Sequence, residues 1–461
     1  MIKTKWTLAC DERGELCALE DQFITIEDGL IKQVSEKAPL DGSNLVDYGF
    51  AIAMPGLINL HCHLDYSKLS INDLPSCSGG LGSDSKSILF AWIPALIAKT
   101  SSWSESDYFA SALHGASLAA KAGTSFVVDN SFQAITGLSA LAHLRLKGLV
   151  GLELFGVDPE QANNQFAIWQ DRFEKARLGI ANLSDSIDLT VSPHAPYTVS
   201  PQLWRLAADF AMERNTKVLA HVAESSLERD WFANENLDEN QEIDRFLTQA
   251  FTRFRNQDGI VEQVTKMVRS LEWRGSGHSP VEHLKRHSLL DSNLIATHCV
   301  VANDEDIESM RRNSTSIALC PVSNFLLANG RAPIEKFFSS NLKMGLGTDS
   351  LASSYSLDLR EQARFILENQ NERHKDNRLT SKQLLSLLTI KAACALGKNK
   401  YLGSIETGKS ADILILKLPK DLGAYTNVFD MALSRDALVE DLFVDGNKVV
   451  SKGDLVQVEA L

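Results

Sequence analysis

Two histidines, His61 and His63, end an apolar run and are separated by one residue. In a β-strand, residues i and i+2 point to the same face, so the two imidazoles would project together while Cys62 points away. Two neutral imidazoles aimed at one point are half of a metal site. Because so short a motif also arises by chance, it indicates a metal only if other strands end in further ligands.

Further ligands do follow later apolar runs. His221 ends the run KVLAH, and Asp349 follows the run MGLGT. Three neutral nitrogens and one carboxylate suit zinc or iron(II) and leave room for one water, whose pKa a divalent ion lowers toward about 7. The predicted metal ligands are therefore His61, His63, His221 and Asp349.

Hydrolysis at an sp² carbon also needs a group that carries a proton from water to the leaving group. Glu224 follows the ligand His221 closely enough to reach both, so we predict it as the general acid and base. His298 is expected to form a hydrogen bond with the attacking water or to polarise a ring nitrogen of the substrate. His194 is expected to face the substrate. Since no lysine follows the strand that ends near His194, no residue is available to bridge two metals. The sequence favours one divalent ion, Zn²⁺ first and Fe²⁺ as the alternative.

These residues need a scaffold that brings strand ends together. From residue 54 to 403, short apolar runs alternate with longer helical patterns, which is typical of βα units around a parallel sheet. Eight strands close a barrel, and catalytic groups collect at their C-terminal ends. The predicted fold is therefore α/β, a (βα)8 TIM-type barrel, with strands in GLINLHCH, SFVVDNS, LVGLELFG, LTVSPHAP, KVLAHVAES, LIATHCV, SIALCPVSN and MGLGTDS.

The two ends of the chain differ from this middle part. Residues 1–53 and 404–461 read as short strands with turns, and each end contains an Asp-Gly hairpin signal, Asp28-Gly29 and Asp445-Gly446. Each end is too short to bury a core alone. We expect both to pair into one small β-sandwich domain, because the ends of a domain often lie close together.

An unusually long connection of about 70 residues separates the fifth and sixth predicted strands, with a helical insertion at about 228–292. It follows a strand on the active-site face, so it is expected to form a lid or substrate wall; an extra helical pair or an oligomer contact is the alternative. His283 and His287 are spaced i, i+4 on one predicted helix, but without an acidic partner we expect them on the surface.

Composition excludes several classes of protein. With 44% hydrophobic residues, 23% charged residues and a net charge of −13, a nucleic-acid-binding surface is not expected. Seven scattered cysteines without a C-x-x-C pair exclude a zinc finger and fit a reducing cytosol. The N-terminus lacks the apolar core of a signal peptide, and no run approaches the roughly 20 residues of a membrane helix. We expect a cytoplasmic protein without a membrane partner. The sequence does not decide between a monomer and a homodimer.

The segments PGLINLHCH, SPHAPYTVS, AHVAES, ATHC and GLGTDS together resemble the amidohydrolase superfamily, in the branch of adenosylhomocysteine and methylthioadenosine deaminases. The resemblance spans nearly the whole chain. It implies a metal-binding barrel with a small β-sandwich built from both termini. Carried onto this sequence, it implies the same four metal ligands, Glu224 as proton shuttle, and His298 in contact with the attacking water.

Three further segments, LERDWF, CPVSNFLLANG and TDSLASSYSLDLREQ, are similar to aminodeoxyfutalosine deaminases of menaquinone biosynthesis. That family hydrolyses the 6-amino group of an adenine whose ribose carries a benzoate. Trp92 and Ser353 match substrate-lining positions of the wider branch, although core packing explains Trp92 nearly as well. One departure is the run Ala352-Ser353-Ser354, which replaces an Asn-rich run after Asp349.

We therefore predict hydrolytic deamination of a purine nucleoside, with aminodeoxyfutalosine as the leading substrate. The alternatives within the superfamily are adenosylhomocysteine, methylthioadenosine, guanine, and chlorinated or alkylamino triazines. A barrel that has lost catalysis and only binds a partner is a different class. It would lack some of the ligands, whereas every expected ligand is present.

Overall fold

The computed structural model describes most of the chain. The described residues are 1–38, 44–75, 87–180, 186–235, 237, 241–255, 261–370, 378–419 and 427–456. Within these ranges we find no helix with the length and hydropathy that a membrane crossing requires.

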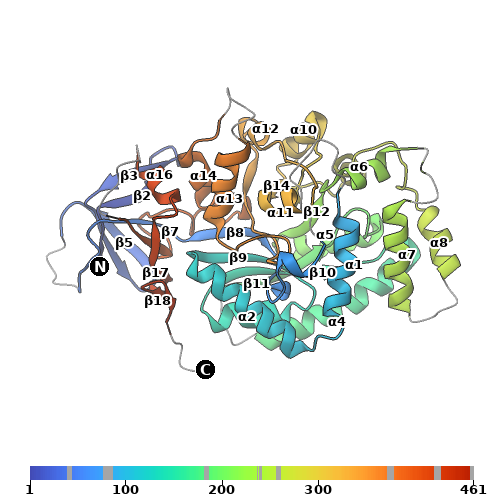
Figure 1. Ribbon diagram of the computed structural model, residues 1–461, viewed down its shortest axis with the longest axis horizontal. Coiled ribbons are helices and arrows are strands. Elements are labelled where there is room, and N and C mark those ends of the chain that lie inside the picture. Colours follow the sequence, from blue (N-terminus) through green and yellow to red (C-terminus); the bar gives the residue numbers. More distant parts are fainter. Residues whose placement is uncertain are drawn as a thin grey trace.

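Eight parallel strands form one sheet in which each strand pairs with its neighbours along the chain (Figure 1). The sheet closes on itself, because the Asp349 N–H donates to the His61 carbonyl at 3.0 Å and Cys62 forms a parallel bridge with Asp349. This confirms the predicted barrel and all eight predicted strands. They are β8 (Leu57–Cys62), β9 (Thr124–Ser131), β10 (Lys147–Leu154), β11 (Ile187–Pro193), β12 (Val218–Val222), β13 (Leu294–His298), β14 (Ser316–Leu319) and β15 (Lys343–Leu346).

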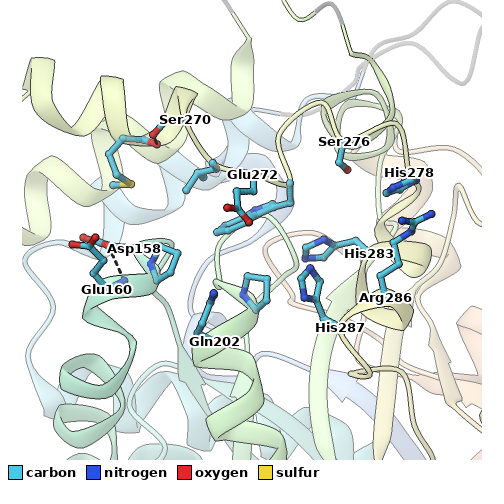
Figure 2. Close-up of a pocket in the computed structure, with 15 residues that line it drawn as sticks. Asp158, Glu160, Gln202, Ser270, Glu272, Ser276, His278, His283, Arg286 and His287 are labelled. Carbon is cyan, nitrogen blue, oxygen red and sulfur yellow. Dashed lines mark hydrogen bonds between the residues drawn. The ribbon is translucent and has the colours of Figure 1, made fainter.

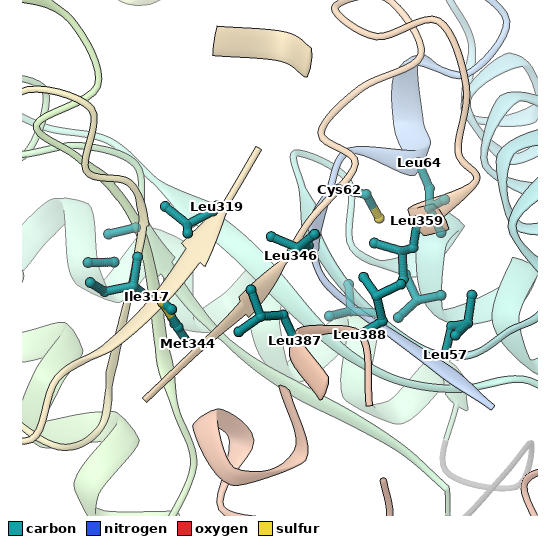
Figure 3. Packing of buried hydrophobic residues seen from close by; sticks show 14 of the residues in the cluster. Leu57, Cys62, Leu64, Ile317, Leu319, Met344, Leu346, Leu359, Leu387 and Leu388 are labelled. Carbon is teal, nitrogen blue, oxygen red and sulfur yellow. The ribbon is translucent and has the colours of Figure 1, made fainter. Parts of the chain in front are cut away.

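Barrel strands are covered on both faces, which explains why they are continuous apolar runs. Every residue of β9 and β10 is buried. Cys62 packs into the apolar cluster around Leu64 and Leu346 (Figure 3), and its thiol faces the Val128 carbonyl at 3.5 Å. The pleat therefore turns Cys62 away from His61 and His63, as predicted.

Helices follow the strands and cover the barrel. Ser200 caps the start of α5, since its hydroxyl accepts a hydrogen bond from the Leu203 N–H. Gly123 lies just beyond the end of α2 and has φ +97°, a conformation that glycine adopts readily. The helices outside the insertion are α1 (Leu89–Thr100), α2 (Glu105–Lys121), α3 (Ile135–His143), α4 (Ala162–Ile180), α5 (Pro201–Glu213), α10 (Asp304–Arg312), α11 (Pro321–Leu326), α12 (Ile334–Ser339), α13 (Leu359–Phe365), α14 (Ser381–Leu387), α15 (Ile390–Leu396) and α16 (Val428–Leu433).

The insertion after β12 is helical, as predicted. It extends from the end of the molecule opposite the terminal strands (Figure 1). An amphipathic pattern makes α7 pack one face against α1 and α8. Its helices are α6 (Ser226–Ala233), α7 (Glu242–Arg255), α8 (Val261–Arg269) and α9 (Pro280–Arg286).

Strands from both ends of the chain lie side by side (Figure 1). Ala53 of β7 pairs with Ile415 of β16, and both Asp-Gly pairs form hairpin turns with positive φ. Nonpolar residues of the two terminal sheets share a buried cluster, in agreement with a sandwich; the domain limits stay a prediction. One sheet contains β5 (Leu30–Ser35), β4 (Phe23–Glu27), β1 (Ile2–Lys3) and β6 (Val46–Asp47), and the other β19 (Asp454–Leu455), β18 (Asn447–Ser451), β17 (Leu438–Val444), β16 (Ile413–Lys417), β7 (Ala51–Pro55), β2 (Trp6–Cys10) and β3 (Leu16–Glu20).

A buried ion pair joins the barrel to these terminal strands. The Lys147 ammonium at the start of β10 lies 2.9 Å from Asp412 and 2.7 Å from Asp445. Lys147→Ala is expected to destabilise the protein by about 3–5 kcal/mol, because it leaves the buried Asp412 carboxylate without its cation. The midpoint of urea unfolding measures this loss.

The exposed pair of Lys398 and Asp188, at 3.0 Å, offers a matched control. Lys398→Ala is expected to cost at most about 1 kcal/mol, since exposed pairs are screened by water. Equal midpoints for the two variants would contradict the role given to Lys147.

Candidate active site

The barrel brings all four predicted metal ligands to one point. His61 lies in β8, His63 directly follows it, His221 lies in β12, and Asp349 follows β15. The nearest carboxylate oxygen of Asp349 is 3.7 Å from His61 Nε2 and 3.8 Å from His63 Nε2. Because β8 and β15 are neighbours only after the barrel closes, closure is what assembles this site.

Strand ends at this face have unusual backbone conformations. Ala223, His298 and Asp349 adopt left-handed φ values of 52°, 72° and 59°. Non-glycine residues rarely adopt this region, and such strain clusters at active sites. Of these three residues, His298 and Asp349 themselves line a cavity, and Ala223 directly precedes the lining residue Glu224.

The donor set fits a divalent metal ion. The Nδ1 atoms of His63 and His221 lie 2.7 and 2.8 Å from the carbonyl oxygens of Asn130 and His194, so each must carry its proton on Nδ1. Both Nε2 lone pairs then face each other at 3.1 Å, a separation expected of two nitrogens bound to one zinc ion at about 2.1 Å. His61 Nε2 is also buried, without a hydrogen-bond partner in the described part of the chain.

Protonation states agree with metal binding. Burial lowers the pKa of His61 to about 4 and lowers the pKa of His63 and His221, so their lone pairs are available at neutral pH. Burial opposes ionisation of Asp349, but the neighbouring histidines outweigh it and hold its pKa well below the usual value. Asp349 also accepts a 2.5 Å hydrogen bond from the Ser323 hydroxyl.

Glu224 lies beside this cluster. Its carboxylate oxygen is 3.7 Å from His298 Nε2 and accepts a 3.0 Å hydrogen bond from the Asn329 amide. Burial raises the pKa of Glu224, which favours a group that both takes and returns a proton near neutral pH. His298 Nδ1 is 2.9 Å from Asn324 Oδ1 and so carries the ring proton, which leaves Nε2 as an acceptor.

A cavity of about 400 Å³ opens above the histidines and contains His194, Glu224 and Asp349 among its lining residues. Its walls are strongly aromatic. Helix α7 of the insertion contributes to the wall, so the predicted substrate wall is supported over the alternative of a remote helical pair. The aromatic lining residues are Tyr66, Trp92, Trp103, Tyr108, Phe132, Phe155, Tyr197, Phe246 and Phe251.

The three predicted substrate residues have different positions. His194 lines the cavity with its Nδ1 3.0 Å from the Thr198 hydroxyl, and burial lowers its pKa to about 3. Trp92 is 7% exposed and lines the cavity, so it is both a buried packing residue and part of the cavity wall. Ser353 is fully buried, its hydroxyl donates to the Ser350 carbonyl, and it is not among the lining residues of the described cavity. A direct role for Ser353 in binding stays a prediction without support from its position.

Sequence reasoning missed several site residues. Glu153 is the next-to-last residue of β10, lines the cavity, and has its pKa raised to about 8 by burial and by Asp65. Its place at a strand end was the available signal. Ser323, Asn324 and Asn329 contact Asp349, His298 and Glu224, in that order. All three lie in the run CPVSNFLLANG, which carries part of the resemblance, but the run does not indicate which groups they contact.

A second, wider hollow of about 760 Å³ lies between the insertion and the start of α5 (Figure 2). His283 lines it but is only 4% exposed, so its predicted surface position is wrong; His287 is exposed as predicted. The imidazole of His283 packs against Phe232 and Trp273, and burial lowers its pKa to about 3. Of the two histidines spaced i, i+4, His283 therefore packs inside the insertion and His287 lies on the surface.

Comparisons with known proteins agree with this geometry. The family model described as "Amidohydrolase family" matches residues 52–453. A 5-methylthioadenosine/S-adenosylhomocysteine deaminase of Thermodesulfovibrio yellowstonii is 27% identical, covering 98% of this chain and 93% of the relative. A 5'-deoxyadenosine deaminase of Methanosphaera stadtmanae is 26% identical, covering 94% and 91%.

The fold is similar to that of a solved structure, an adenosine deaminase from Xanthomonas campestris with bound zinc. The TM-score is 0.74 at 20% sequence identity, and the match covers 99% of this chain and 94% of the other. At this identity the likeness concerns the fold alone.

Proposed function

Because the chain belongs to the amidohydrolase family, we propose that it is a metal-dependent deaminase that hydrolyses the 6-amino group of an adenine nucleoside. The observation that carries this proposal is one buried constellation. Three unprotonated histidine nitrogens and a carboxylate meet beside Glu224 at the base of an aromatic cavity. The deaminase names of the two full-length relatives support the choice of reaction.

In the proposed reaction, His61, His63, His221 and Asp349 would hold one divalent ion, zinc first and iron(II) as the alternative. When bound, the ion would supply Lewis-acid activation of the attacking water. Glu224 would take a proton from this water and deliver it to the ring nitrogen beside C6. The His298 Nε2 acceptor would orient the water by accepting a hydrogen bond.

Water oxygen would form a bond to C6, and the C6–N bond would then break. Glu224 would transfer the second proton to the departing amine, so that ammonia leaves and a C6 carbonyl remains. The aromatic walls, Trp92 among them, would stack on the purine, and His194 would face its edge. Both proton transfers thus pass through one carboxylate.

Within this class we propose aminodeoxyfutalosine as the preferred substrate, in menaquinone biosynthesis. Aromatic residues of the cavity lining, including Trp103 and Phe251, suit an aryl group on the ribose. The described lining residues include no lysine or arginine, so the carboxylate would lie in the open mouth near Ile97, which is 39% exposed.

The same apolar lining favours a second candidate class, nucleosides with a small uncharged 5′ group. Methylthioadenosine and 5′-deoxyadenosine, two of the three substrates in the names of the relatives, are of this kind; the third, S-adenosylhomocysteine, is not. Both would avoid placing a carboxylate near the apolar wall. A nucleoside with a zwitterionic tail is disfavoured by the same argument.

An ammonia-release assay with a panel of nucleosides tests the proposal. We expect kcat/KM for aminodeoxyfutalosine to exceed that for adenosine by about 10- to 100-fold, because burying an aromatic ring contributes about 1.5–3 kcal/mol. A preference for methylthioadenosine would select the second class. Highest efficiency with adenosylhomocysteine would contradict both, and absence of ammonia release with every nucleoside would contradict the proposed reaction.

A further inference from the structure

We propose that Asn329 is a positioning residue that holds the Glu224 carboxylate, and that Ser87 in turn fixes Asn329. Through these two bonds, the cavity wall formed by α1 and the proton-carrying carboxylate would be held as one unit. The proposal rests on the proposed function only for the role given to Glu224.

The three side chains form a chain of hydrogen bonds. The Asn329 amide nitrogen donates to Glu224 Oε1 at 3.0 Å, and the Ser87 hydroxyl donates to Asn329 Oδ1 at 2.5 Å. Since a carboxylate only accepts, the amide must turn its NH₂ group toward Glu224, and the Ser87 hydroxyl then satisfies the remaining oxygen. Each of the three residues is 5% exposed, so water is poorly placed to replace a lost bond.

Other contacts of Glu224 do not fix the carboxylate. The Glu228 side chain accepts hydrogen bonds from the backbone N–H groups of Ala223 and Glu224, which fixes the main chain only. His298 Nε2, at 3.7 Å, is too distant for a direct hydrogen bond. Among the residues that the structure describes, Asn329 provides the hydrogen bond that sets the direction of this carboxylate.

The start of α1 is docked on the same segment. The Ile88 N–H donates to the Leu327 carbonyl at 3.0 Å, two residues before Asn329. Farther along α1, the Trp92 indole donates to the Ala352 carbonyl at 3.3 Å, three residues after Asp349. Because α1 also lines the cavity, a substrate that presses on this helix acts on the residues that hold Glu224.

A double-mutant cycle on the metal-loaded enzyme tests the chain of bonds. Asn329→Ala is expected to lower kcat by about 10- to 100-fold, the effect of losing a hydrogen bond to a charged group, with KM changed by less than about threefold. Ser87→Ala is expected to lower kcat less, and to have no further effect when Asn329 is already alanine. If the kcat losses of Ser87→Ala and Asn329→Ala multiply in the double variant, Ser87 does not act through Asn329 and the proposal is overturned. An unchanged kcat in Asn329→Ala would also overturn it.

Variants that preserve shape separate positioning from folding. Asn329→Asp keeps the size but replaces the donor by an acceptor, so its kcat is expected to fall at least as far as that of Asn329→Ala. Ser87→Thr keeps the hydroxyl and is expected to restore most of the activity lost in Ser87→Ala. Asn313→Ala, on the exposed end of α10, is the matched control and should leave kcat unchanged.

Crystal structures of wild type and Asn329→Ala give a readout that does not depend on turnover. The Glu224 carboxylate is expected to leave its position beside His298 in the variant. An unmoved carboxylate would overturn the positioning role even if activity falls. If the wild type hydrolyses no nucleoside, the proposed function fails, whereas the position of Glu224 in the variant still decides this proposal.

Discussion

Glu224→Gln is expected to lower kcat for ammonia release by about 10²- to 10⁴-fold, while the metal content stays at the wild-type level. Glutamine matches glutamate in size and can keep a hydrogen bond to Asn329, but it cannot take a proton from water. General acid–base catalysis contributes an effect of this size. Steady-state ammonia release gives kcat, and elemental analysis of the same sample gives the metal content.

A control for this substitution is Glu262→Gln on the exposed helix α8, where the glutamate side chain is 82% exposed. That variant should match the wild type in both measurements. If Glu224→Gln keeps more than about a tenth of the wild-type kcat, Glu224 is not the proton carrier. If its metal is lost as well, the carboxylate serves the metal instead of the proton.

His221→Ala and Asp349→Ala are each expected to weaken metal binding by more than about 100-fold. Even residues that only support a metal ligand account for 10- to 100-fold, and these two are predicted to bind the ion directly. In His221→Ala, His63 Nε2 also loses the second nitrogen, His221 Nε2 at 3.1 Å, with which it would hold the ion. Elemental analysis after dialysis, followed by a titration with Zn²⁺, measures the change.

His143→Ala provides the matched control, because this histidine is exposed at the end of α3, away from the strand ends. Its metal content should equal that of the wild type. A His221→Ala protein with a full complement of tightly bound metal would show that the ion is held by other groups. The cluster of His61, His63 and Asp349, which does not include His221, would then be the next site to test.

Local patterns in the sequence were sufficient to predict the barrel, and the four residues proposed as metal ligands lie together in it. The two-residue period of a strand placed His61 and His63 on one face, and apolar runs located the eight strand ends. Contacts made through loops could not be predicted in this way. The partners Asn329 and Glu224 are 105 positions apart, and their meeting depends on how the segment after β14 folds back over the barrel.

The same limit explains the other differences. Burial of His283 depends on Phe232 and Trp273, which come from separate parts of the insertion. The spacing of His283 along its own helix does not reveal contacts with residues that are distant in the sequence. Glu153 differs, since it lies near the end of β10, where a functional side chain is expected from the sequence pattern alone.

The pairing of β7 with β16 cannot form until most of the chain has been synthesised. Ala53 and Ile415 are neighbours in the sheet but about 360 positions apart in the chain. At about 5–20 residues per second, β16 leaves the ribosome roughly 20–70 s after β7. During that interval the edge of β7 has no partner on one side, and unpaired edges promote aggregation. We expect the yield of folded protein to depend on chaperones that cover this edge until translation ends.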